Sequence, residues 1–151
     1  MTYKEYRDER EEQVKKLPIF FAFSDEQFEE ELKKRGLTKD DKGLLLRLTN
    51  GIYCLRQDRK IVQDYFRVDH DAELRQMMED NYNFARAAIA YEMANHEYPT
   101  NTQKDFDVCS CFGTIAYGKG KDGTDYLKEL GFSDNIIRIY EDEARNICME
   151  F

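Results

Sequence analysis

Apolar positions recur at helical spacing along most of this chain, and charged residues fill the positions between them. Thr2 and Glu5 have capping-box spacing, so a first helix is predicted from Thr2 to about Lys16. Ser24 and Gln27 repeat this spacing, and Gly36 is a suitable residue to end the helix they begin. Further helices are predicted near residues 58–67, 71–79, 81–95, 103–111 and 124–130, with a last one after Ser133.

Two segments instead favour extended structure. In LPIFFAF (17–23), Pro18 disfavours a helical residue before it, and the aromatic residues that follow indicate a buried strand. In LLLRLTNGIYCLR (44–56), Asn50-Gly51 separates two apolar runs, which predicts a β-hairpin with positive φ at both turn residues. An alternative keeps Leu44 to Leu48 helical and only residues 52–55 extended.

Together these patterns predict an α+β fold that is mainly helical. It has about six or seven helices and a small two- or three-stranded antiparallel sheet, with strands near 19–22, 44–49 and 52–56. The chain shows no internal repeat, no low-complexity segment and no long linker, so residues 1–151 are expected to form a single domain.

Charge and cysteine content narrow the classes of partner. The chain has 23 Lys and Arg against 31 Asp and Glu, a net charge of −8, so direct nucleic-acid binding is not expected. Its longest apolar run is far shorter than the ~20 residues of a membrane span. The charged N-terminus is unlike a signal peptide, and the four cysteines have no disulfide framework spacing. We therefore expect a cytoplasmic protein with reduced thiols and no membrane partner, its oligomeric state open.

Few residues of the sequence are candidates for catalysis or metal binding. Cys109 and Cys111 would point apart on a helix and have no metal-ligand partner at local spacing, so they are interpreted as structural thiols. Glu92 and His96 lie four residues apart, so on one helix they would form a carboxylate–imidazole pair. Such a pair could act as a general base or supply two ligands to a metal. The simpler interpretation is a histidine that caps the carbonyl groups at the end of a helix. No catalytic motif, cofactor motif or complete metal site is predicted.

An acidic run offers a different kind of surface. Asp25, Glu26, Glu29 and Glu30 fall at the start of the second predicted helix. Carboxylates along one helix face stand roughly 5–6 Å apart, similar to the phosphates of a nucleic-acid strand. Such a row could occupy a basic groove on another protein, or it could be an ordinary solvated face.

Three further segments carry a resemblance to a family: LPIFFAFSDEQF (17–28), NGIYCLRQD (50–58) and YEMANHEY (91–98). With the MTYKEY opening, they resemble small acidic proteins of bacteriophages and gut bacteria, a family of unknown function. The resemblance covers most of residues 1–100 and weakens across 106–131. Where that family tends to show Gly-Gly-Phe-Tyr, this chain has Asn50-Gly51-Ile52-Tyr53. The resemblance implies a mobile-element context and a candidate polar surface that comprises Tyr53, Tyr91, Glu92, Asn95, His96 and Tyr98.

These observations lead to a first hypothesis and two alternatives. The first is a non-enzymatic protein-binding accessory protein of a phage or mobile element, acting as an acidic inhibitor of a host nucleic-acid-binding defence protein. One alternative is a small metal-dependent enzyme that uses Glu92 and His96, with His70 as a further candidate. The other is a self-associating structural protein.

Overall fold

The computed structural model describes residues 1–149 and confirms the mainly helical α+β fold, with eight α-helices and one three-stranded sheet in that range. Contacts group the chain into two compact units. The first contains residues 1–8 and the chain from Asp69 onward, and the second contains residues 9–68. The prediction of a single domain stays a prediction, because such a grouping does not show whether either unit folds alone.

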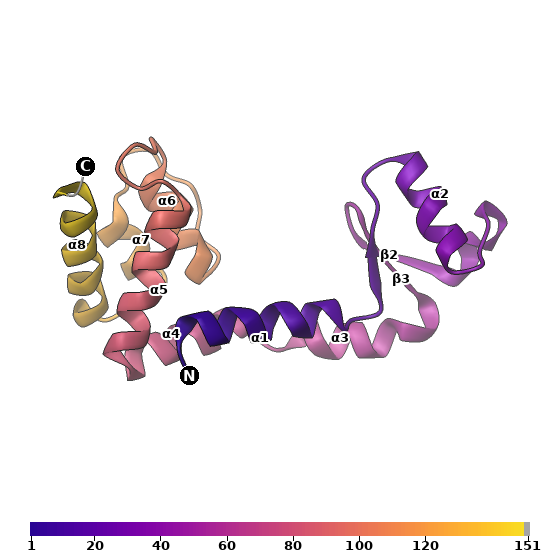
Figure 1. Cartoon of the computed structure of the whole chain (residues 1–151), viewed down its shortest axis with the longest axis horizontal. Helices are drawn as coiled ribbons and strands as arrows, with labels where there is room; N and C mark the ends of the chain where they lie inside the picture. Colours follow the sequence, from indigo (N-terminus) through magenta and orange to yellow (C-terminus); the bar gives the residue numbers. More distant parts are fainter. Residues whose placement is uncertain (150–151) are drawn as a thin grey trace. The chain divides into compact units, whose positions relative to one another are not determined.

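The elements follow one another in the order labelled in Figure 1. The α-helices and strands are α1 (Tyr3–Lys15), β1 (Ile19–Phe21), α2 (Asp25–Lys34), β2 (Leu45–Thr49), β3 (Ile52–Leu55), α3 (Arg59–Arg67), α4 (His70–Asp80), α5 (Tyr82–Asn95), α6 (Lys104–Cys109), α7 (Gly123–Glu129) and α8 (Asp134–Met149). Three short 3-10 helices are η1 (Lys39–Leu44), η2 (Arg56–Asp58) and η3 (Ser110–Phe112).

The sheet of residues 9–68 is antiparallel, with strand order β1-β3-β2. Its β2–β3 hairpin confirms the strand interpretation of residues 44–56, so the helical alternative for Leu44 to Leu48 is wrong. In the turn, Gly51 has a positive φ of +80° and Asn50 does not. The prediction of a positive φ at both turn residues is therefore wrong for Asn50. The irregular register between Arg47 and Thr49 accounts for this, since a bulge changes the twist that the turn must match.

The run LPIFFAF is only partly buried, which corrects the expectation of a buried strand. Phe20 is buried against Leu32 and Leu45, whereas Phe21 and Phe23 are 49% and 75% exposed. Two physical causes explain the difference. Successive side chains of a strand point to opposite faces, so Phe21 faces away from the cluster around Phe20. Phe23 lies beyond β1, directly before Ser24, the N-cap of α2.

The larger core lies in the first unit, among helices α4 to α8. Figure 1 shows α5 and α8 side by side, and these two helices are in contact. The fully buried side chains at their interface and around it include Met78, Ile89, Met93, Val108, Phe112, Tyr126 and Leu127. Within residues 1–149, none of the helices combines the length and the apolar character needed to cross a membrane.

Candidate functional site

Helix α5 carries the first two residues of the site. It begins where the Asn81 side chain accepts a hydrogen bond from the Phe84 amide, and it buries one face that includes Ala85, Ala88 and Ile89. Glu92 lies on this buried side and is the one charged residue buried within residues 1–149. A buried carboxylate is costly without partners, so its contacts show what holds it there.

Both carboxylate oxygens of Glu92 have partners. Oε1 accepts a hydrogen bond of 2.7 Å from the Tyr3 hydroxyl, and Oε2 accepts one of 3.2 Å from the Cys111 thiol. Oε2 also lies 3.6 Å from Nε2 of His96. The pKa of Tyr3 is raised by burial and by the nearby carboxylate, so Tyr3 stays a hydroxyl donor at neutral pH.

Cys111 reaches the site because α6 ends at Cys109 and continues as the tighter helix η3. Cys109 points into the core and is fully buried, as predicted for a structural thiol. Cys111 is half-buried instead, and its Sγ lies 3.3 Å from Nε2 of His96. The wide angle between residues two apart on a helix thus sends one thiol to the core and the other to Glu92 and His96.

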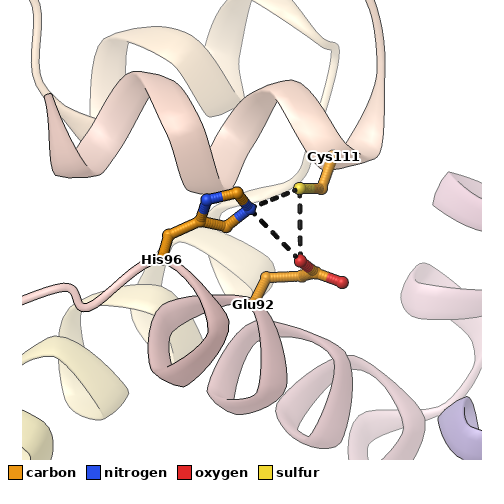
Figure 2. Close-up of side chains that lie close together, drawn as sticks. All are labelled: Glu92, His96 and Cys111. Atoms are coloured by element: carbon orange, nitrogen blue, oxygen red, sulfur yellow. Dashed lines mark hydrogen bonds and ion pairs between the residues drawn. The ribbon is translucent and has the colours of Figure 1, made fainter.

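The three side chains therefore meet at one point, as Figure 2 shows. The distances between Sγ, Nε2 and Oε2 are 3.2, 3.3 and 3.6 Å. Tetrahedral zinc bound to one sulfur, one nitrogen and one oxygen holds its ligand atoms roughly 3.3–3.6 Å apart. The point equidistant from the three atoms lies about 2 Å from each, close to the usual zinc–ligand bond lengths.

A catalytic cysteine relay fits this geometry less well. In such a relay the carboxylate contacts the imidazole nitrogen that faces away from the thiol, and so orients the ring. Here Glu92 and Cys111 approach the same nitrogen of His96. Burial and the charge of Glu92 raise the pKa of Cys111 to about 12, whereas nucleophilic cysteines have lowered pKa values.

A second set of polar contacts fixes the positions of these ligands. The Asn101 side-chain amide donates to the His96 carbonyl at 2.9 Å and to Oδ2 of Asp107 at 2.8 Å. Asp107 lies four residues before Cys111 in the same segment, and its carbonyl oxygen is 3.4 Å from Sγ of Cys111. Such outer contacts orient metal ligands in proteins, so the segment after α5 and helix α6 hold the site as a unit.

The polar surface predicted from the resemblance is only partly brought together. Glu92 and His96 meet, while Tyr98 is buried and donates a hydrogen bond of 2.8 Å to Asp105. Tyr91 lies under the Arg7 guanidinium, 3.8 Å from it, and Asn95 is exposed. Tyr53 belongs to the second unit, where its ring stacks on Phe20.

The remaining predicted residues lie elsewhere. His70 begins α4, with Nδ1 3.6 Å from Glu73, and takes no part in the three-ligand cluster. In α2, Asp25, Glu26 and Glu30 are exposed, whereas Glu29 pairs with Lys39 at 2.6 Å. Sequence reasoning missed Tyr3 and Cys111 as site residues, because they lie 89 and 19 residues from Glu92 and no local spacing marks them.

Comparisons with known proteins give one match. A family model described as a family of unknown function, DUF7659, matches residues 2–115. This range contains Tyr3, Glu92, His96 and Cys111, so the whole cluster falls within the matched part. Neither the curated proteins nor the solved structures contain a match to the chain.

Proposed function

Since the chain belongs to the family of unknown function DUF7659, its activity has to be inferred from its own geometry, and we propose that it is a zinc-binding protein. Its ligands are Glu92, His96 and Cys111. The observation that carries the proposal is the mutual distance of the three candidate ligand atoms, 3.2 to 3.6 Å.

The donor set favours zinc among the divalent cations. Thiolate and imidazole are ligands that magnesium and calcium avoid, and one carboxylate completes a set that suits zinc. Three protein ligands leave the fourth tetrahedral position to a water, the arrangement of catalytic zinc sites. Bound zinc lowers the pKa of that water to near 7, so the site could activate it for attack on a substrate. This agrees with the alternative of a small metal-dependent enzyme.

The test compares metal binding by matched cysteine variants. We expect purified protein loaded with zinc and dialysed to retain one equivalent, and cobalt-loaded protein to show thiolate-to-cobalt charge-transfer absorption. Cys111→Ser should lose this absorption and bind zinc at least about 100-fold more weakly, because the thiolate is lost. Cys148→Ser is the control, since Cys148 is an exposed thiol outside the cluster. Equal zinc affinity in the two variants would overturn the proposal.

The protein-binding function predicted from sequence is a second proposal, for which the exposed acidic residues at the start of α2 are the support. An inhibitor of a basic host protein would lose that partner when Asp25, Glu26 and Glu30 are replaced by Asn and Gln. Neutralising three exposed carboxylates of α4 and α8, in Asp71→Asn, Asp134→Asn and Glu141→Gln, should leave binding intact. Capture of the same host protein in equal amounts by both variants would contradict the inhibitor proposal. This second proposal includes the origin of the protein in a phage or mobile element.

A further inference from the structure

A second site is suggested by the distribution of charge in residues 9–68. Between Lys33 and Lys60 the chain carries nine Lys and Arg and only three Asp, although the whole protein is strongly acidic. One of the three, Asp41, caps the start of η1: its carboxylate accepts a hydrogen bond of 2.8 Å from the Thr38 amide. The segment that contains the hairpin is therefore a basic surface on an acidic protein.

A pocket of about 840 Å³ opens within this basic segment, beside the β2–β3 turn and the start of α2. Lys39, Lys42 and Arg47 line it, with Asp25 as its one acidic residue. Its volume falls in the range of small-molecule binding sites. All of its lining residues lie within residues 22–53, so the pocket belongs wholly to the second unit.

The sheet register places a cation beside an aromatic ring in this pocket. Arg47 of β2 pairs with Tyr53 of β3, which pairs with Phe20 of β1, so these side chains share one face of the sheet. The Tyr53 ring stacks on Phe20 with their centroids 5.4 Å apart. Phe28 of α2 packs against the same Tyr53 ring at 5.0 Å. Arg47 is thus held at the edge of a rigid aromatic cluster.

Phe23 supplies an exposed ring to the lining of the pocket. It is 75% exposed, and it lies so close to Gly51 that a Cβ at this glycine would stand 2.3 Å from the ring. A large apolar side chain held in solvent offers a surface on which another planar ring can stack. The hairpin glycine therefore has two roles, the turn itself and the support of this ring.

The cations retain hydrogen-bonding capacity. Arg47 donates to the Asn50 side chain through one guanidinium nitrogen, which fixes its direction and leaves further donors. Lys42 makes no ion pair within residues 1–149, whereas Lys39 is already paired with Glu29. Two exposed cations beside an exposed aromatic ring are the combination that recognises phosphate next to a planar base.

We infer that this pocket binds a nucleotide, with its phosphate at Lys42 and Arg47 and its base against the ring of Phe23. Free nucleotides and single-stranded nucleic acid share this chemistry. The expectation that nucleic acid is not bound came from the charge of the whole chain, and the basic segment departs from that average. The inference uses no residue of the zinc site and is independent of it.

The test measures binding of three probes, ADP, a ten-residue oligothymidylate and inorganic pyrophosphate, in buffer with EDTA so that no metal contributes. ADP or the oligonucleotide should bind more tightly than pyrophosphate, and whichever binds more tightly identifies the source of the nucleotide. Lys42→Gln with Arg47→Gln should weaken binding roughly tenfold, because two phosphate contacts are lost. Lys16→Gln with Arg59→Gln is the control of equal charge, since both residues are exposed and outside the pocket.

Phe23→Ala separates base recognition from simple attraction of anions. Since Phe23 is exposed, its truncation should leave folding intact, weaken ADP or oligonucleotide binding about fivefold or more and leave pyrophosphate unchanged. Three results would overturn the inference. They are no binding of any probe, equal affinity of the Lys42/Arg47 variant and its control, and pyrophosphate binding as tight as that of the two nucleotide probes.

Discussion

The two units of the chain differ in core size and in charge, and the difference explains which kind of site each can hold. The first unit buries a large apolar cluster and carries ten Lys and Arg against nineteen Asp and Glu. Residues 9–68 bury a cluster of three residues, Phe20, Leu32 and Leu45, and carry thirteen basic against twelve acidic residues.

A large core can hold convergent polar side chains out of water, whereas a thin one leaves its polar groups at the surface. Glu92 is kept in place by Tyr3, Cys111 and His96 within well-packed helices, which suits a metal ion. Lys42 of η1 and Arg47 of β2 instead line a surface pocket, which suits an anion that arrives from solvent. The first unit is thus strongly acidic, whereas the second is close to neutral and contains a basic hairpin segment.

The largest expected effect tests the difference in core size between the two units. Ile89→Ala should reduce the free energy of unfolding by about 3 kcal/mol, because Ile89 is fully buried in the larger core and the change leaves a cavity. Ile61→Ala, the same change at a 58% exposed position in residues 9–68, should cost less than about 0.5 kcal/mol. Urea unfolding curves measure both. Similar losses would show that α5 is not the packed centre of its unit.

The pH dependence of zinc binding tests whether the thiolate of Cys111 binds the metal. Burial and the charge of Glu92 raise the pKa of Cys111 to about 12, so at neutral pH zinc has to displace one proton from the thiol. Zinc affinity should therefore fall about tenfold per pH unit as the pH is lowered from 8 to 7. Competition with a chelator of known affinity measures this slope. A pH-independent affinity would exclude the thiolate as a ligand.

Tyr3→Phe tests the support of Glu92. It removes the hydroxyl that donates to Oε1 at 2.7 Å and keeps the ring packed on Phe84, so zinc affinity should fall roughly tenfold. Tyr117→Phe is the control, because Tyr117 is 61% exposed and outside the cluster. Zinc titration measures the affinity of both variants. Equal affinities would contradict the role assigned to Tyr3.

The smallest expected effect concerns the second site. Glu29→Gln removes the partner that holds Lys39 at 2.6 Å and leaves an additional unpaired cation at the pocket. Nucleotide affinity should rise by about twofold, an amount typical of one exposed charge. Glu12→Gln makes the same charge change in α1, where Glu12 is paired with Lys15 at 3.5 Å, and should leave nucleotide affinity unchanged. A rise of the same size in both variants would indicate a general charge effect.

The sequence was sufficient where the determining contacts are local. Asn50-Gly51 between apolar runs identified the hairpin, and the spacing of Glu92 and His96 placed them on one face at the end of α5. A turn and a helix depend on neighbours a few residues away, so single-sequence patterns report them well. The resemblance seen in short segments implied a family of unknown function, and the chain does belong to a family so described.

The rest depended on contacts between distant segments. Cys111 meets Glu92 and His96 only because α6 packs against α5, and Tyr3 reaches Glu92 across 89 residues of chain. The covered face of β1 is set by its packing on Leu32 and Leu45, so no local pattern predicts the exposure of Phe21. The average charge of the chain also concealed a basic hairpin segment.

X-ray absorption at the zinc edge of zinc-loaded protein tests the central claim most directly, because it counts the atoms bound to the metal. We predict one sulfur at about 2.3 Å and three nitrogen or oxygen atoms at roughly 2.0–2.1 Å, contributed by Cys111, His96, Glu92 and a water. The sulfur should disappear in Cys111→Ser and persist in Cys148→Ser. A zinc ion without sulfur, or with two, would contradict a site built from these three residues.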